Sequence, residues 1–365
     1  RRPRMQGGAA EKDAGGEGAR GTAPSLEELL REECGDPSSL QSLSLSNRHL
    51  AAVPDGIGQL VALQTLNLRG NSLTALPLSL ARLKSLQSLD VRGNSLTSLP
   101  EGICRLDCLQ SLDLRGNRLA ELPSGVGRLA CLRTLRLSEN RLKGLPDGIG
   151  QLGALRSLEL SGNLLVRLPG SIGELAALQT LEAFDNQLGT IPEDIGQLAS
   201  LRALDLGRNE LTEVPESIDQ LTGLKTLSLL GNRLTVLPRG LGLLPALETL
   251  HLAGNLLVAM PEDLSGLRSL QTLHLWNNQL VQLPRSLGRL RALQTLELHG
   301  NELQALPESV GRLAALQTLD LRENCLEELP WGVGNLANLR AVDVRRNKFP
   351  ELPQCLCILQ QRGVK

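Results

Sequence analysis

The chain of 365 residues contains almost no aromatic side chains: tyrosine is absent, and phenylalanine and tryptophan contribute two residues each. A globular core of this size normally uses many aromatic residues to fill its irregular gaps. Their scarcity argues against one large core and indicates that leucine does nearly all the packing. We therefore expect one small core unit built many times along the chain, although length alone suggests two or three domains.

The sequence also lacks an excess of charge of either sign, because 38 lysines and arginines face 39 aspartates and glutamates. It has no basic stripe of the kind that binds nucleic acid, so we expect no nucleic-acid partner. No apolar run approaches the roughly 18 residues that a membrane-spanning helix needs, and residues 1–20 carry no apolar secretory signal. These absences favour a cytoplasmic protein.

The seven cysteines lack the spacing of a disulfide framework. A lone Cys34 near the start cannot close that end with a disulfide, and no Asn-x-Ser/Thr glycosylation site occurs. Both features favour a reducing, intracellular compartment. Cys108 and Cys131 share the last position of adjacent repeats, where we expect two small buried thiols; a disulfide between them would need oxidising conditions.

The N-terminal segment is poor in large apolar side chains. Residues 1–24 cannot bury enough surface to offset the entropy of ordering, which predicts a disordered tail. Ser25 and Glu28 have the spacing of a capping box, so residues 25–39 are predicted to hold a capping helix and its connection. We expect this helix to cover the exposed end of the core; a helix that contacts a separate partner is the alternative.

From Leu40 to residue 361 the sequence repeats every 23 residues without an insertion, which gives fourteen units. In the unit that starts at Leu63, leucines at positions one, four and six alternate with polar residues, as in a short strand with one buried face. Position nine is asparagine, whose amide can bond the backbone of adjacent units as a ladder. Proline at position fifteen starts a return arm, and glycine at position nineteen lets that arm turn.

This pattern predicts an α/β solenoid: a leucine-rich-repeat horseshoe with a parallel inner, concave sheet and short helical or irregular return arms on the convex side. Each unit buries its leucines only against its neighbours, so the array is one-dimensional. Strands about 4.8 Å apart give an inner sheet on the order of 60 Å long. Residues 362–365 are expected to form only the C-terminal end, and the chain is expected to be a monomer.

The return arm Leu-Pro-x-x-Ile-Gly-x-Leu, seen at Leu145, Pro146, Ile149 and Gly150, resembles the typical intracellular leucine-rich repeat of the Ras-group class. That class includes the Ras-binding scaffold of the MAP-kinase pathway, the Scribble-type polarity proteins and plant Ras-group repeat proteins. The resemblance implies adaptor work on the concave face, with a Ras-like GTPase or a phosphatase subunit as the folded partner.

Two units depart from the pattern. The first unit carries Arg48 at the asparagine position, which predicts an irregular capping unit. The last unit has Phe349 in place of a leucine. No kinase, GTPase, PDZ or death-domain segment follows the repeats, so partners that the resembled class reaches through such domains are not expected.

Side chains at positions three, five, seven and eight point out of the inner sheet and do not pack, so they are the best guide to function. In units two to four, arginines at position seven accompany aspartates at position five, and together they form the charged strip: Arg69, Arg92, Arg115, Asp90 and Asp113. The strip is either a solvated ladder of alternating charges or a docking strip for an acidic partner surface.

Units seven to twelve present a different face, because two of the four aromatic residues and three of the four histidines fall at exposed positions there. Exposed aromatic side chains often dominate the binding energy of an interface; the alternative is neutral drift in a repeat array. We predict a partner-binding surface that comprises Phe184, Asp185, Leu230, His251, His274, Trp276, Asn277 and His299. Its histidines also allow a metal site, which lacks a converging acidic or cysteine ligand, or a pH-sensitive contact.

The sequence contains none of the common catalytic motifs, such as G-x-x-x-x-G-K-S/T, H-E-x-x-H or G-x-S-x-G, and its glycines follow the repeat period. We therefore predict a non-catalytic scaffold or adaptor in intracellular signal transduction, without a cofactor or metal, that holds a folded protein in its concavity. The alternative is a recognition module of a larger receptor, ligase or immune-sensor protein.

Overall fold

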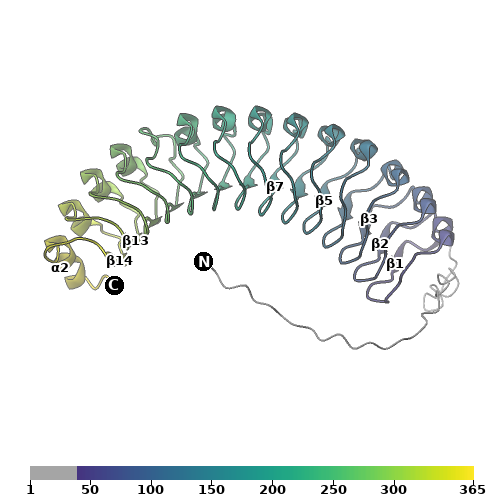
Figure 1. Ribbon diagram of the computed structural model, residues 1–365, viewed down its shortest axis with the longest axis horizontal. Coiled ribbons are helices and arrows are strands. Elements are labelled where there is room, and N and C mark those ends of the chain that lie inside the picture. The colour runs from purple at the N-terminus through teal and green to yellow at the C-terminus, as the bar shows by residue number, and fades with distance from the viewer. Residues whose placement is uncertain (1–38) are drawn as a thin grey trace.

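The computed structural model describes residues 39–365, which form one curved solenoid (Figure 1). Fourteen short strands make a single sheet whose spatial order follows the chain. Neighbouring strands are parallel and shifted by one repeat, as where Leu66 aligns with Leu89. The predicted α/β solenoid with a parallel inner sheet is confirmed, whereas the predicted tail and capping helix lie outside the described residues.

Each strand has three residues, and in all but the last the middle residue is buried because it points into the core. The strands are β1 (Ser42–Ser44), β2 (Thr65–Asn67), β3 (Ser88–Asp90), β4 (Ser111–Asp113), β5 (Thr134–Arg136), β6 (Ser157–Glu159), β7 (Thr180–Glu182), β8 (Ala203–Asp205), β9 (Thr226–Ser228), β10 (Thr249–His251), β11 (Thr272–His274), β12 (Thr295–Glu297), β13 (Thr318–Asp320) and β14 (Ala341–Asp343).

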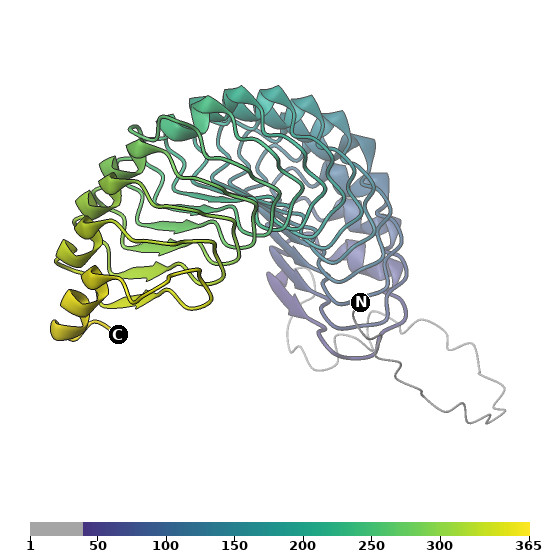
Figure 2. The same cartoon turned by 60° about the vertical axis from the view of Figure 1, so that its left-hand side comes forward.

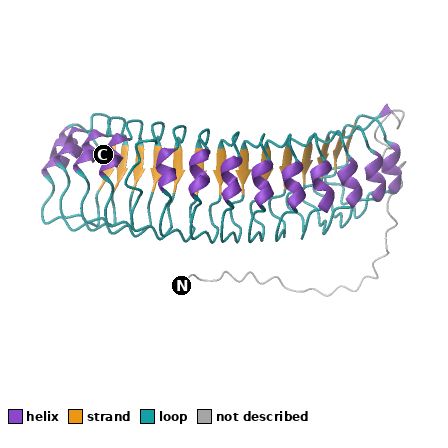
Figure 3. Ribbon diagram, turned by 90° about the horizontal axis from the view of Figure 1, so that it is seen from above, coloured by secondary structure: helices purple, strands orange, loops and turns teal. Residues whose placement is uncertain are grey.

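Most return arms contain a five-residue 3-10 helix that follows the proline at position fifteen, whose fixed φ suits the entry to a helix. Figures 1 and 3 show these helices on the convex side and the strands on the concave side. The helices are η2 (Asp55–Gln59), η3 (Leu78–Arg82), η4 (Glu101–Arg105), η5 (Ser124–Arg128), η6 (Asp147–Gln151), η7 (Gly170–Glu174), η8 (Glu193–Gln197), η9 (Glu216–Gln220), η10 (Arg239–Leu243), η11 (Arg285–Arg289), η12 (Glu308–Arg312), η13 (Trp331–Asn335) and, as an α-helix, α2 (Gln354–Gln361).

One continuous leucine core runs between the sheet and the return arms. Leucines such as Leu112 in β4 and Leu273 in β11 are at most 1% exposed, and a fully buried leucine contributes about 1.5–3 kcal/mol. The asparagine ladder is also present. The side-chain amide of Asn117 donates to the carbonyls of Val91 and Leu114, and its Oδ1 accepts from the backbone N–H of Leu96. Each ladder asparagine thus joins neighbouring units through buried polar groups.

The predicted irregularity of the first unit is confirmed by its backbone. His49, at position ten, has φ of 56°, in the left-handed region that few residues other than glycine adopt; the other units use this conformation only at position eight. The backbone N–H of Leu50 donates to Oδ1 of Asn71 at 3.0 Å, as the equivalent group does in other units, and the N–H of Arg48 makes an additional bond of 3.0 Å to the same oxygen.

The expectation that Cys108 and Cys131 are buried is wrong. Both thiols are free and exposed, because the last position of a repeat lies on the outer turn that leads from the return arm into the next strand, outside the leucine core. The buried thiol in this region is Cys104, which lies in η4. Burial raises the pKa of Cys104 to about 11, so its thiol stays protonated at neutral pH.

Candidate functional site

Four of the predicted partner-binding residues gather in one group on the concave sheet. Figure 2 gives an oblique view of the curved backbone that carries this sheet. The parallel register aligns His251 with His274, and their ring centroids lie 4.4 Å apart. The indole of Trp276 stacks on the imidazole of His299, with centroids 5.4 Å apart and planes 5° from parallel. Since Trp276 also lies 6.5 Å from His251, we name these four residues the histidine–tryptophan cluster.

Two carboxylates flank this cluster on its C-terminal side. Nδ1 of His274 lies 2.6 Å from an oxygen of Glu297 in the next unit. Nδ1 of His299 lies 3.1 Å from an oxygen of Asp320, at an angle that does not make a hydrogen bond. The side chains of His274 and His299 keep 21% and 25% of their surface exposed, so the cluster is held by its neighbours and still meets the solvent.

His251 differs from the other two histidines because no carboxylate of the described residues lies within ion-pair distance of its ring. Burial lowers the pKa of His251, and the neighbouring His274 lowers it further, against weaker opposing effects of Glu297 and Asp205. The ring of His251 is therefore neutral at physiological pH. A neutral imidazole packed against an indole provides an apolar contact surface with one hydrogen-bonding edge.

Phe184 does not join the histidine–tryptophan cluster. Its ring lies over Gly207 of the next unit, where a β-carbon would come within 2.9 Å of the ring. The guanidinium carbon of Arg208 lies 5.2 Å from the centre of the same ring, a cation–π contact. The sequence pattern did not predict either contact of Phe184. The one signal was Gly207 at position seven, because a residue without a side chain there leaves room for a ring from the neighbouring unit.

Asp185 and Asn277 follow the two aromatic residues at position eight, where glycine is common. Their φ angles are 57° and 53°, and aspartate and asparagine tolerate this left-handed region better than most residues. Both side chains are exposed. Leu230 is half-buried between the two aromatic regions, and Ala253, at position seven between Leu230 and Trp276, is fully buried by its neighbours.

Four residues of the charged strip form a network in which each arginine pairs with an aspartate. Both carboxylate oxygens of Asp113 accept from the guanidinium of Arg115, at 3.0 and 2.6 Å, and Arg92 contacts Asp90 at 3.2 Å and Asp113 at 3.9 Å. Two residues outside the prediction, Arg136 and Glu159, extend the network and pair at 2.8 Å. The five predicted residues do not all join, because Arg69 is exposed and has no carboxylate of the described residues within ion-pair distance.

Between these two regions the sheet carries an acidic stretch. Its central residue, Glu182, has a raised pKa because the carboxyl group is partly desolvated in the hollow of the sheet and because Glu159 and Asp205 repel its charge. The side chain of Glu182 still reaches the solvent, which screens the repulsion from the neighbouring carboxylates. The concave face thus runs from a neutralised network through an acidic centre to the histidine–tryptophan cluster.

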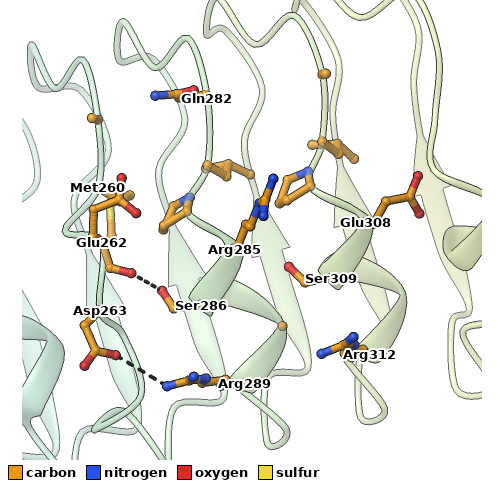
Figure 4. A pocket seen from close by; sticks show the side chains of 17 residues that line it. Met260, Glu262, Asp263, Gln282, Arg285, Ser286, Arg289, Glu308, Ser309 and Arg312 are labelled. Atoms are coloured by element: carbon orange, nitrogen blue, oxygen red, sulfur yellow. Dashed lines mark hydrogen bonds and ion pairs between the residues drawn. The ribbon is translucent and has the colours of Figure 1, made fainter.

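A groove of about 1050 Å³ lies on the return arms of units ten to twelve (Figure 4). It exists because unit ten is the one complete unit within residues 39–365 that has no helix in its return arm. That arm instead packs against η10, where Gly266 N–H donates to the carbonyl of Gly242 and a β-carbon on Gly266 would come within 2.4 Å of the backbone of Leu243. Opposite-sign groups face across the groove, such as Asp263 and Arg289 at 4.0 Å.

The described residues do not assemble a metal centre. In residues 39–365, no group of three or more histidines, cysteines, aspartates or glutamates is arranged to hold an ion. The large groove contains neither histidine nor cysteine in its lining. No helix within the same range is long and apolar enough to cross a membrane.

Comparisons with known proteins agree with this architecture. A family profile described as "Leucine-rich repeat region" matches residues 30–115, 85–163, 112–189, 170–256 and 285–361, and one described as "Leucine rich repeat" matches residues 245–303. A search of curated protein sequences gave no significant match.

Several solved structures are similar. A leucine-rich repeat protein of Leptospira interrogans is 33% identical, with a TM-score of 0.71, over 93% of this chain and 98% of that one. The plant peptide hormone receptor RGFR1, solved in complex with RGF2, is 30% identical, with a TM-score of 0.57, over 85% of this chain and 64% of that one. The functional domain of InlJ from Listeria monocytogenes has a TM-score of 0.73 over 87% of this chain and 65% of that one; at 24% identity it shows the fold alone.

Proposed function

This chain belongs to the leucine-rich repeat family, and from that premise we propose that it is a non-catalytic scaffold that holds a folded protein on its concave face. Leucine-rich repeat proteins generally act as protein-binding scaffolds. The observation that carries the proposal is the histidine–tryptophan cluster, in which Trp276 is packed in place and half-buried at the concave surface.

The cluster has the physical properties of an interface anchor. Tryptophan is enriched among the residues that contribute most to binding energy. Because Trp276 is already stacked on His299, binding would immobilise few additional rotamers, which lowers the entropic cost of association. The flanking carboxylates of Glu297 and Asp320 and the nearby Asn277 would form the polar rim around an apolar centre.

The partner class that fits the resemblance is a signalling protein such as a Ras-like GTPase or a phosphatase subunit. A cytoplasmic location is part of this proposal. It is supported by the cysteines within residues 39–365, which are all free thiols, as expected in a reducing compartment. Phe184, with Asp185 and Leu230, would then contact a second part of the same partner along the curve.

Affinity capture from a cell extract tests the proposal, with the intact chain and the variants Trp276→Ala and Phe184→Ala as baits. We expect Trp276→Ala to lose the captured partner and Phe184→Ala to weaken its recovery. Leu78→Ala is the control, since it removes an exposed apolar side chain from a return arm that no proposed contact uses. Equal recovery by all four proteins would remove the concave cluster as the binding surface. Purified Ras-like GTPases and phosphatase subunits test the partner class directly.

A second candidate function is peptide recognition as a module of a larger receptor. The observation that favours it is the similarity to the receptor RGFR1, which was solved in complex with RGF2 and of which this chain covers 64%. Separating the extract into peptide and protein fractions before capture distinguishes the two functions. A ligand retained only from the peptide fraction would favour the receptor module over the scaffold.

A further inference from the structure

Away from the concave face, two large apolar side chains are exposed on the return arms near the C-terminal end. Trp331, the first residue of η13, is 60% exposed, and Leu352, just before α2, is 64% exposed. Both line one hollow of about 350 Å³ between the arms of units thirteen and fourteen. A single exposed apolar residue is ordinary on a protein surface, whereas two that share a hollow form one small apolar surface that a partner side chain can cover.

Both residues stand out against their equivalents in other units. Leu352 occupies position fourteen, where Leu329 of the preceding unit is 9% exposed and Leu306 is 7% exposed. Trp331 occupies position sixteen, where the preceding units carry Glu308 and Arg285. Leu78, at position sixteen of unit two, is also exposed, but its neighbour at position fourteen, Leu76, is 6% exposed. The pairing of two exposed apolar side chains is therefore specific to this end of the solenoid.

The charge around this apolar surface has one sign. Glu327, Glu328 and Glu351 line the same hollow, and its lining contains no lysine or arginine. All three side chains are exposed, and none lies within ion-pair distance of a basic group of residues 39–365. We name these three glutamates, with Trp331 and Leu352, the C-terminal hollow. Three carboxylates around an indole attract a cation both by charge and through the face of the ring.

We propose that the C-terminal hollow binds a short basic segment of a partner protein. One apolar side chain of that segment packs against Trp331 and Leu352, and flanking lysine or arginine side chains pair with the three glutamates. The size of the hollow fits a few side chains of an extended segment and is too small for the face of a folded domain. This contact is separate from the concave face, so a partner held there and a basic segment bound here can occupy the chain together.

Tryptophan fluorescence tests the proposal on the intact chain. The variant Trp276→Phe leaves Trp331 as the one indole of the sequence. A short peptide of alternating lysine and leucine should shift its emission to the blue and saturate, whereas peptides of glutamate and leucine or of lysine and glycine should not. Raising the salt concentration should weaken the binding, because exposed charges are screened.

Charge reversal separates a specific contact from general attraction. We expect Glu328→Lys with Glu351→Lys to weaken peptide binding by about tenfold or more, as expected when two attractive pairs become repulsive. The matched control is Glu213→Lys, an exposed glutamate at the position of unit eight that corresponds to Glu328; it should leave the affinity unchanged. Circular dichroism checks that each variant keeps its fold.

Three results would overturn the proposal. The first is equal binding of the acidic and basic peptides, and the second is the same loss from the control as from the double variant. The third is a dimer, measured by sedimentation, that Leu352→Ser dissolves, because the hollow would then belong to a second copy of the chain. Since Trp276 is absent from the fluorescent variant, failure of this test leaves the proposed function of the concave face untouched, and the reverse also holds.

Discussion

In units three to six the outward-pointing side chains of the concave sheet pair with one another, whereas in units ten to twelve they present an indole and three imidazoles at the surface. Asp113 is 5% exposed beneath its arginine partners, while Trp276 stays only half-buried on its histidine. A partner that docks on the network must compete with hydrogen bonds already made, whereas one that docks on Trp276 removes apolar surface from water. The same scaffold therefore carries paired charges in units three to six and an aromatic surface open to solvent in units ten to twelve.

The largest expected effect tests whether the two regions differ only at the surface. Leu112→Ala lies beneath the charged network and Leu273→Ala beneath the histidine–tryptophan cluster, both at the centre of a strand and both buried. Each should lower the free energy of unfolding by about 2–5 kcal/mol, as the loss of a buried leucine does. Chemical denaturation measures this. A clearly larger loss in one unit would show that the scaffold itself differs between the regions.

The next effect concerns binding of the captured partner. Trp276→Ala should weaken its affinity by about tenfold or more, because a packed tryptophan at the centre of an interface carries much of the binding energy. Arg115→Ala should change the affinity by less than about threefold, since its guanidinium is already paired with Asp113 and partly screened. Isothermal titration calorimetry compares the two variants, and a reversed order would assign the partner to the charged network.

A smaller effect concerns stability of the charged network. Asp113→Ala leaves Arg115 and Arg92 without the carboxylate between them, and we expect a loss of about 1.5 kcal/mol of unfolding free energy, reduced from a fully buried case because both arginines reach the solvent. Ser228→Ala, at the same position of unit nine, is the control and should cost less than about 0.5 kcal/mol. Equal losses in thermal unfolding would mean that the network does not stabilise the fold.

The smallest effect is a difference in pH dependence. Because the pKa of His251 is lowered in the folded chain, the unfolded chain takes up the proton first as the pH falls below the ordinary value of 6.5. The stability that neutral His251 contributes is therefore complete above that pH and is lost as the pH falls toward the lowered pKa. His251→Gln should flatten the fall in Tm with acidification over this range, while the exposed His49→Asn should not. Parallel curves for all three proteins would contradict the shift.

Much of the scaffold could be predicted because its physics is local. A leucine that recurs every 23 residues can be buried only if each unit stacks on the next, so the period alone gives the strands, their parallel order and the ladder of residues such as Asn117. The exposed face could be predicted as a list of positions, since alternation along a strand decides which side chains point outward. Trp276 and the three histidines were identified in this way.

The contacts between exposed side chains of adjacent units could not be predicted from the same pattern. The indole of Trp276 lies against His299, while the ring of Phe184 lies toward Arg208, because side-chain rotamers are chosen by the neighbours across the sheet. The acids Glu297 and Asp320, which lie beside two of the histidines, were missed for the same reason.

The sequence by itself determined the solenoid, its fourteen-strand inner sheet and the row on which each exposed residue stands, because burial of leucine and the 23-residue period leave one arrangement open. Only the tertiary structure decided which exposed groups are satisfied: the paired arginines of units three to six, the open cluster around Trp276, and the hollow beside Trp331. That division has a physical reason. Core packing repeats in every unit, whereas contacts between exposed side chains depend on the particular residues that adjacent units bring together.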